Sequence, residues 1–115
     1  MLFRLRRYTV EPGKAGVFTT FFVERMLPIQ KDNGAILVGQ WKTEDDTKIY
    51  NLWVYESMEQ CQASDASVMR DPRAAAAGEY RQQAFGSLYT AVRETFMTSA
   101  IPLEATALAH LVRGF

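Results

Sequence analysis

Apolar and polar side chains alternate over the first ten residues, which predicts a β-strand at the start of the chain. Successive side chains of a strand point to opposite faces of a sheet. Arg4, Arg6 and Tyr8 therefore share one face, and apolar residues share the other. Arginines on an internal strand of a small domain are costly unless an anionic group meets them. We therefore look for function on this polar face.

The next segment, from position 14 to about 32, repeats apolar residues at spacings of three and four. This spacing predicts an amphipathic helix with one broad apolar face, after a turn that contains Pro12 and Gly13. The apolar face comprises Val17, Phe18, Phe21, Phe22, Met26 and Ile29. Pro28 is expected to kink or loosen the last turns, and Asn33-Gly34 to end the helix.

Two strands are predicted over residues 35–43 and 48–56, on either side of an acidic loop at 44–47. Both strands are apolar on both faces, with Leu37 and Trp41 assigned to one face of the first. A sheet with one face in water alternates apolar with polar residues. We therefore expect helices to cover one side of this sheet and another surface to cover the second side.

The second half of the chain continues the alternation of helix and strand. Its predicted elements are a helix from a capping box at 57–60 to about residue 70, a helical piece over 72–89, a strand over 91–99 and a terminal helix over 103–113. Asp71 and Pro72 suit the cap and first position of the second helix. A helix is an alternative for 91–99, because Arg93 and Glu94 tolerate either state.

The order β-α-β-β-α-β, with extra helices, is the split βαβ or ferredoxin-like arrangement. We expect a single α+β domain over residues 1–115, with a core over about 2–99 and a four-stranded antiparallel sheet. An open sheet with helices on one face calls for a partner on the other. Two such sheets packed face to face would form an α/β barrel across the axis of a homodimer.

Charge and cysteine content narrow the class of function. Thirteen basic and thirteen acidic residues leave no net charge to attract nucleic acid or an anionic membrane. The single cysteine, Cys61, excludes an internal disulfide and a cysteine metal cluster, and is expected to be a buried structural thiol. No apolar stretch has the length of a signal-peptide core or a membrane span. With a single cysteine, a reducing, cytoplasmic location is the expectation.

A small-molecule site is predicted on the polar face of the sheet. Arg4 and Arg6 lie about 7 Å apart along a strand, close enough to hold one carboxylate or phosphate. The alternative is an internal salt bridge to Glu94 or Glu56. Aromatic residues make up 12% of the chain, so some of them should line a pocket or an interface. The predicted ligand-binding residues are Arg4, Arg6, Tyr8, Trp41, Asn51, Trp53 and Tyr55. The alternative for Trp53 and Tyr55 is packing at the dimer interface.

Tyr8, Asn51 and His110 are the candidates for proton transfer. Histidine titrates near neutral pH, which suits a general base. A lone histidine on a short terminal helix is also typical of a surface or interface residue. No spacing of histidine with carboxylates indicates a metal site, and no glycine-rich phosphate loop is present, so we expect neither a metal nor a cofactor.

Several motifs, in order along about residues 1–99, resemble the NIPSNAP family. They are LRRYTVEPGK near the start, Leu27-Pro28 with Gln30, the GA-LVGQW stretch from Gly34 to Trp41, NLWVYES from Asn51 to Ser57, and RETFMTSAIP in the last predicted strand. That family belongs to the dimeric α/β-barrel superfamily, with antibiotic-biosynthesis monooxygenases and stress-responsive barrel proteins. The resemblance implies this fold and a homodimer.

The resemblance implies no single activity, because one fold hosts many chemistries. The family usually has a glutamate on the first strand where this chain has Arg4, so an internal Glu–Arg pair is missing or rebuilt here. Some relatives in the superfamily bind haem through histidine, so the resemblance gives haem ligation as a second possible role for His110.

The sequence is compatible with three functions. The leading hypothesis is a protein that binds a small organic molecule, acidic or aromatic, in a pocket of each subunit. The second is an enzyme of the cofactor-independent monooxygenase or isomerase type, with a proton shuttled by Tyr8, Asn51 or His110. The third is a structural or partner-binding dimer with a filled barrel and no ligand.

Overall fold

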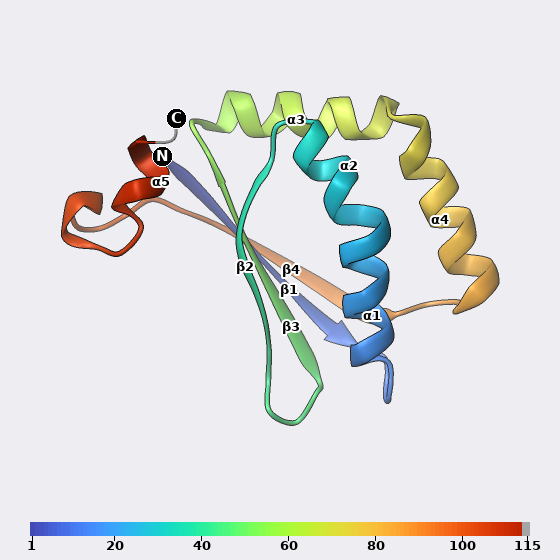
Figure 1. Ribbon diagram of the computed structural model, residues 1–115. Coiled ribbons are helices and arrows are strands. Elements are labelled where there is room, and N and C mark those ends of the chain that lie inside the picture. Colours follow the sequence, from blue (N-terminus) through green and yellow to red (C-terminus); the bar gives the residue numbers. More distant parts are fainter. Residues whose placement is uncertain (114–115) are drawn as a thin grey trace.

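The computed structural model describes residues 1–113, which form one four-stranded sheet and the helices that connect its strands (Figure 1). The elements are β1 (Leu2–Val10), α1 (Ala15–Phe21), a π-helical turn (Phe22–Met26), α2 (Leu27–Asp32), β2 (Ile36–Lys42), β3 (Lys48–Tyr55), α3 (Met58–Arg70), α4 (Pro72–Ala84), β4 (Tyr89–Met97), a 3-10 turn (Leu103–Ala105) and α5 (Ala109–Arg113). The strand order is β2-β3-β1-β4, with antiparallel neighbours throughout. This is the predicted ferredoxin-like α+β fold.

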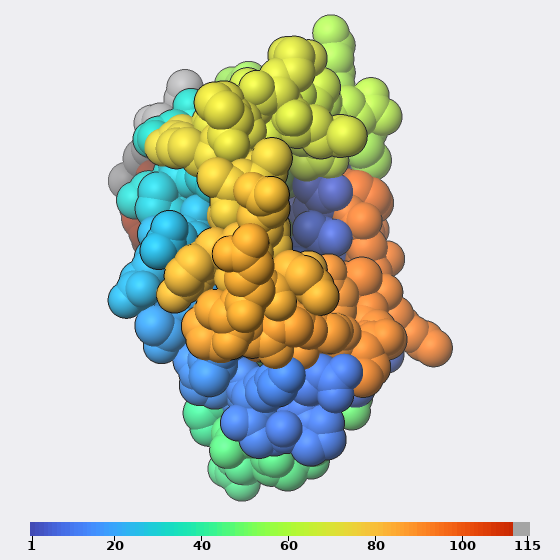
Figure 2. Space-filling view, turned by 90° about the vertical axis from the view of Figure 1, so that its right-hand side faces the viewer, coloured from blue at the N-terminus to red at the C-terminus, as the bar shows by residue number. Residues whose placement is uncertain are grey.

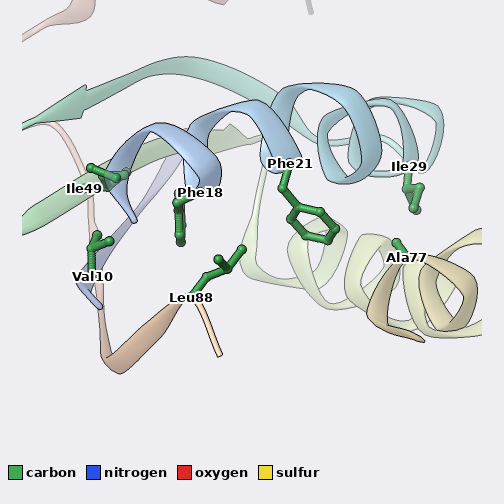
Figure 3. Close-up of a cluster of buried hydrophobic side chains, with 8 residues drawn as sticks. Val10, Phe18, Phe21, Ile29, Ile49, Ala77 and Leu88 are labelled. Atoms are coloured by element: carbon green, nitrogen blue, oxygen red, sulfur yellow. The ribbon is translucent and has the colours of Figure 1, made fainter. Parts of the chain in front are cut away.

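The helices α1 to α4 lie on one side of the sheet, and the C-terminal segment with α5 lies on the other (Figure 1). Phe18 and Phe21 of α1 and Ile29 of α2 point toward Leu88 and Ala77 across a buried core (Figure 3). The apolar spacing predicted from position 14 to 32 is therefore confirmed as the face that covers the sheet. In a single chain the sheet is open, and its second face is only partly covered.

A π-helical turn interrupts the first helical segment just before Pro28. Proline lacks an amide hydrogen and cannot donate to the carbonyl of Glu24, as a residue in an α-helix would. The helix is irregular as predicted, but in the turn before the proline. The prediction that its last turns are loosened is wrong, because Leu27–Asp32 is a regular α-helix. A π turn adds a residue to the local ring and changes which side chains face inward.

The capping predictions for α3 and α4 are confirmed. Ser57 Oγ accepts a hydrogen bond from the backbone N–H of Gln60 (3.1 Å), and Asp71 Oδ1 accepts one from that of Arg73 (3.0 Å). The predicted helical piece over 72–89 is too long, because α4 ends at Ala84. Gly86 has a φ of +68°, which the chain uses to turn toward β4.

The last predicted strand is confirmed, and the helical alternative for it is wrong. β4 spans Tyr89–Met97, pairs with β1 along its length and forms an edge of the sheet. The terminal helix predicted over 103–113 is split into a 3-10 turn and α5. Thr106 lies between them, and its Oγ1 accepts a hydrogen bond from the N–H of Leu108 (3.2 Å), a local bond that competes with a continuous helix.

Within residues 1–113, no helix is long and apolar enough to cross a membrane.

Candidate functional site

A cavity of about 230 Å³ lies between the sheet and the helices on its covered side. It is lined by Arg6, Tyr8, Phe18, Phe21, Phe22, Met26, Gln30, Trp53, Ala74, Gly78, Arg81, Leu88 and Tyr89. Two of these residues are cations and none is a carboxylate. Figure 2 shows β1 (dark blue) at the bottom of a hollow between α3 and α4 on one side and β4 (orange) on the other. The cavity is thus apolar in its walls and positive in its charge.

The sheet, the π turn and α4 supply residues of the cavity wall. The β1–β3 register places Arg4 opposite Trp53 and Arg6 opposite Asn51, so these residues share the face under the helices. The π turn contributes both of its end residues, Phe22 and Met26. From α4 come Ala74, Gly78 and Arg81, whose spacing of four and three places them on one helix face.

Arg4 lies on the predicted face but is fully engaged by carboxylates. Its Nη1 and Nη2 donate to the two oxygens of Asp65 (2.8 and 2.9 Å), and its Nε donates to Glu94. Burial alone would lower the pKa of the Arg4 guanidinium, but the hydrogen bonds to both carboxylates outweigh it and raise that pKa. Of the two predicted partners, Glu94 is confirmed and Glu56 is not among the ion pairs of the described chain.

Asp65 was not predicted, because helix spacing alone does not show which polar residue of α3 turns toward the sheet. The bidentate Arg4–Asp65 pair ties α3 to β1, and Glu94 adds β4. The pairing expected from the family's glutamate on the first strand is therefore rebuilt around an arginine. Arg4 has a structural role that leaves little of its charge for a ligand.

Arg6 differs sharply from Arg4, two residues before it on the same face. No residue in the described part of the chain makes a hydrogen bond or ion pair with the Arg6 side chain, and its buried Nε has no partner. Glu94 lies opposite Arg6 in the β1–β4 register, but its carboxylate binds Arg4. The Arg6 guanidinium lies 5.6 Å from the ring centre of Tyr8 and forms part of the cavity wall.

Tyr8 closes one end of the cavity with other aromatic rings. Its ring centre lies 5.0 Å from that of Phe18 and 5.1 Å from that of Tyr89. Burial raises the pKa of the Tyr8 phenol, and the opposing effect of the nearby Arg6 charge is smaller. The phenol therefore stays protonated at neutral pH, which suits a hydrogen-bond donor and not a base.

Asn51 is fully buried, at 0% exposure, and pairs with Arg6 in the β1–β3 register without lining the cavity itself. Its Oδ1 accepts a hydrogen bond from Gln40 Nε2 (2.8 Å), while its Nδ2 has no partner in the described chain. A buried polar group without a partner costs about 1–3 kcal/mol, so this one requires an explanation.

Trp53 and Tyr55 are both buried under the helices of their own chain. Trp53 lines the cavity, and its ring centre lies 6.0 Å from that of Phe22 in an edge-on contact. Tyr55 is 1% exposed and packs with Cys61 in a neighbouring core cluster. Their burial under α-helices places both residues away from the open sheet face, where we predicted the dimer interface.

Trp41 lies on the open face of the sheet, away from the cavity. The cause is a β-bulge in β2 between Leu37, which pairs with Trp53, and Gly39, which pairs with Leu52. The extra residue reverses the alternation, so that Trp41 no longer shares the face of Leu37 as we predicted. The Trp41 side chain is 53% exposed, and its ring covers Gly39 so closely that a Cβ there would lie 2.7 Å from it.

His110 is exposed and belongs to α5, on the side of the sheet away from the cavity (Figure 1). It therefore takes no part in this site. Among the residues that line the cavity, none is a histidine or a carboxylate, so a general base for neutral pH is lacking there. No group of three or more potential ligands for a metal ion occurs within residues 1–113.

The sequence interpretation missed the residues that come from α4 and from the start of β4. Arg81, Gly78 and Tyr89 line the cavity, although nothing in the spacing of α4 marks one face as special, since alanines occupy most of its first turns. The large apolar residues of α1 were predicted, but as core. Phe18 and Phe21 belong to the core and also line the cavity.

Comparison with known proteins gives a family and a set of similar folds. A family model described as NIPSNAP matches residues 3–98, and a search of curated proteins finds no match. An uncharacterized NIPSNAP domain protein from Burkholderia xenovorans is 22% identical, with a TM-score of 0.75, over 87% of this chain and 95% of that one.

Two further solved structures are similar. A NIPSNAP family protein of unknown function from Agrobacterium tumefaciens is 22% identical, with a TM-score of 0.76, over 87% of this chain and 88% of that one. SnoaB, a cofactor-independent oxygenase from Streptomyces nogalater, is 16% identical, with a TM-score of 0.62, over 89% and 95% of the two chains. At these identities the likeness shows the fold alone.

Proposed function

This chain belongs to the NIPSNAP family, and we propose that it binds a small organic acid, with an aromatic or otherwise apolar body, in the cavity between the sheet and its helices. The observation that supports this most strongly is Arg6, a partly buried cation with no hydrogen-bond or ion-pair partner in the described chain, at the floor of an apolar cavity. A guanidinium in this position is matched by a carboxylate.

The walls suit the rest of such a molecule. Aromatic rings close the cavity on both sides of Arg6: Tyr8, Phe18 and Tyr89 at one end and Phe22 with Trp53 at the other. Small-molecule sites are usually apolar with a few directed polar groups. A volume of about 230 Å³ lies just below the range of about 300–1,000 Å³ for drug-sized ligands, which favours a molecule of one or two rings.

Calorimetric titration with benzoate and 2-naphthoate, each beside its neutral primary amide, tests the proposal. We expect the wild-type protein to bind the acids and to bind the amides at least about tenfold more weakly. Replacing Arg6→Gln should remove about 1.5–3 kcal/mol of binding free energy, the usual contribution of a hydrogen bond to a charged group.

Arg7→Gln is the matched control, because Arg7 is the next residue of β1 and faces the opposite side of the sheet, paired with Tyr50. It removes the same charge from the same strand and should leave the affinity unchanged. Equal losses in the two variants would mean that only the overall charge matters. No loss in the Arg6 variant would exclude Arg6 as the anchor.

We also propose that two copies associate through their open sheet faces. Trp41 is 53% exposed there, and Tyr50 and Leu52 of β3 share this face through the β2–β3 register. A second copy of the chain offers the same apolar patch, as a two-fold interface requires. A cytoplasmic location remains the prediction from the single cysteine.

The enzyme hypothesis has less support than the binding hypothesis. SnoaB, named as a cofactor-independent oxygenase, shares the fold, but a fold does not carry an activity with it. The residues that line the cavity include a protonated tyrosine and no base for neutral pH. A structural dimer with no ligand has no use for the cavity between the sheet and the helices, so the third hypothesis also has less support.

A further inference from the structure

A row of four polar side chains crosses all the strands on the sheet face that carries the helices, and its β4 end is exposed. The register pairs Gln40 of β2 with Asn51 of β3, Asn51 with Arg6 of β1, and Arg6 with Glu94 of β4. Directly paired residues of antiparallel strands have Cβ atoms about 4.5–5.5 Å apart, so neighbours in this row are within reach of one another. The row passes beneath the cavity at Arg6.

Both ends of the row are already satisfied by the protein. Gln40 Nε2 donates to Asn51 Oδ1 at 2.8 Å, and Glu94 accepts a hydrogen bond from Arg4. In the structure the bond from Gln40 engages Asn51 Oδ1. Because Gln40 occupies the oxygen on the β2 side, the NH₂ group is left for the β1 side, where Arg6 lies.

The middle of the row therefore brings two donors together without an acceptor. Asn51 Nδ2 and Arg6 Nε are both shielded from solvent, and neither has a partner in the described chain. Arginine and the amide nitrogen of asparagine donate hydrogen bonds and accept none. Two such groups side by side are unfavourable unless an oxygen lies between them.

We infer that Asn51 and Arg6 together bind one carboxylate, with Gln40 as the positioning residue that holds the Asn51 amide toward it. This rests on the proposed function and adds how the acid is held: its carboxylate has one oxygen for each donor, and its rings extend into the cavity. Asn51 is buried and does not itself line the cavity, so this arrangement requires the Arg6 side chain to move aside for the carboxylate to reach the Asn51 amide. A neutral amide is rejected, because it has only one acceptor atom and its NH₂ group would face one of the two donors.

Asn51→Asp tests this inference, because it supplies the missing acceptor without a change of shape. Gln40 can still donate to one oxygen of the new carboxylate, and Arg6 donates to the other. We expect the variant to melt at a higher temperature than wild type and to bind 2-naphthoate about tenfold or more weakly. Gln83→Glu on the exposed part of α4 makes the same chemical change away from the cavity and should alter neither value.

Gln40→Glu gives an independent readout. The new carboxylate accepts from Asn51 Nδ2, which turns the amide over and presents Oδ1 to Arg6, so the affinity for 2-naphthoate should fall about tenfold although neither donor is removed. Destabilisation by Asn51→Asp, or wild-type affinity in both variants, overturns the inference. If affinity is lost in Arg6→Gln but not in Asn51→Asp or Gln40→Glu, the proposed function stands and this inference fails. Wild-type affinity in all three variants rejects the inference and the proposed function.

Discussion

Arg4 and Arg6 show how two identical residues on one strand face acquire opposite roles. Both were predicted as anchors for a ligand, and the strand alternation correctly placed them together. Their difference depends on Asp65, which only the packing of α3 brings to Arg4. Sequence spacing predicts which face a residue occupies, but it does not show which of two cations a distant helix will neutralise.

The free energy of unfolding should respond oppositely to replacement of Arg4 and of Arg6. Replacing Arg4→Met leaves Asp65 and Glu94 without their partner and should lower the free energy of unfolding by about 2 kcal/mol. This is less than the about 3–5 kcal/mol of a fully buried pair, because Asp65 is 42% exposed. Replacing Arg6→Met removes a cation without a partner and should raise that free energy by about 1 kcal/mol. Urea unfolding of the purified variants measures both values, and a destabilised Arg6 variant would indicate a structural role.

Gly78 limits the size of the ligand. It lies in the middle of α4 and lines the cavity, and a Cβ at this position meets no atom within 4 Å. Glycine inside a helix costs about 1 kcal/mol relative to alanine, so Gly78→Ala should stabilise the protein by about that amount. Gly78→Phe should fill the cavity and weaken binding of 2-naphthoate about tenfold or more, with a smaller effect on benzoate.

Ala75→Phe provides the control for this pair, because Ala75 is exposed on the same helix. Calorimetry with the two acids compares the variants. Equal affinities for 2-naphthoate in the two phenylalanine variants would mean that the ligand does not extend toward α4.

Among the elements, β2 shows the limit of prediction from alternation. The strand itself was predicted within one or two residues of its observed ends, yet Trp41 was placed on the wrong face. A bulge of one residue before Gly39 reverses every later side chain of the strand. In the first helical segment an irregularity was predicted from Pro28. The π turn found just before this proline supplies two residues of the cavity wall.

The start of α4 should make stability depend on pH. Hydrogen bonds from Arg73, and one from Asn33, lower the pKa of Asp71 below its ordinary value of 3.8. A carboxyl group whose pKa is lowered by folding stabilises the protein above its ordinary pKa, and this contribution is lost as the pH falls toward the folded value.

Asp71→Asn should therefore lower the melting temperature at neutral pH, since asparagine can still cap the helix but has no charge for Arg73. The difference from wild type should narrow as the pH falls below 3.8. Thermal melts followed by circular dichroism at several pH values measure it. A difference that is constant with pH would show that the charge of Asp71 is not what stabilises this junction.

For the whole molecule, the fold was largely predictable because its order of strands and helices is specific. The open face was predicted from strands that are apolar on both sides, and a pocket between the sheet and the helices was predicted from the polar face of the first strand. The size of the cavity and the residues that α4 contributes were not predicted, because they depend on how α4 packs against the sheet. The family model matches residues 3–98, which agrees with the motifs identified along about residues 1–99. Neither the motifs nor the fold identified Arg6 as the residue without a partner.

Association through the open face predicts a specific effect of Trp41. Replacing Trp41→Glu places a charge on an exposed position outside the cavity, so it should convert a dimer into a monomer without unfolding the chain. Native mass spectrometry of gently purified protein gives the mass of the assembly and of any molecule released on denaturation. A wild-type monomer would contradict this interface.

The most direct test of the central claim is a crystal structure of the protein grown with 2-naphthoate. The account predicts the rings between the aromatic walls of the cavity and the carboxylate within hydrogen-bond distance of Arg6. It would be contradicted if the acid bound on the open face of the sheet, bound with its carboxylate turned away from Arg6, or left the cavity empty at saturating concentration.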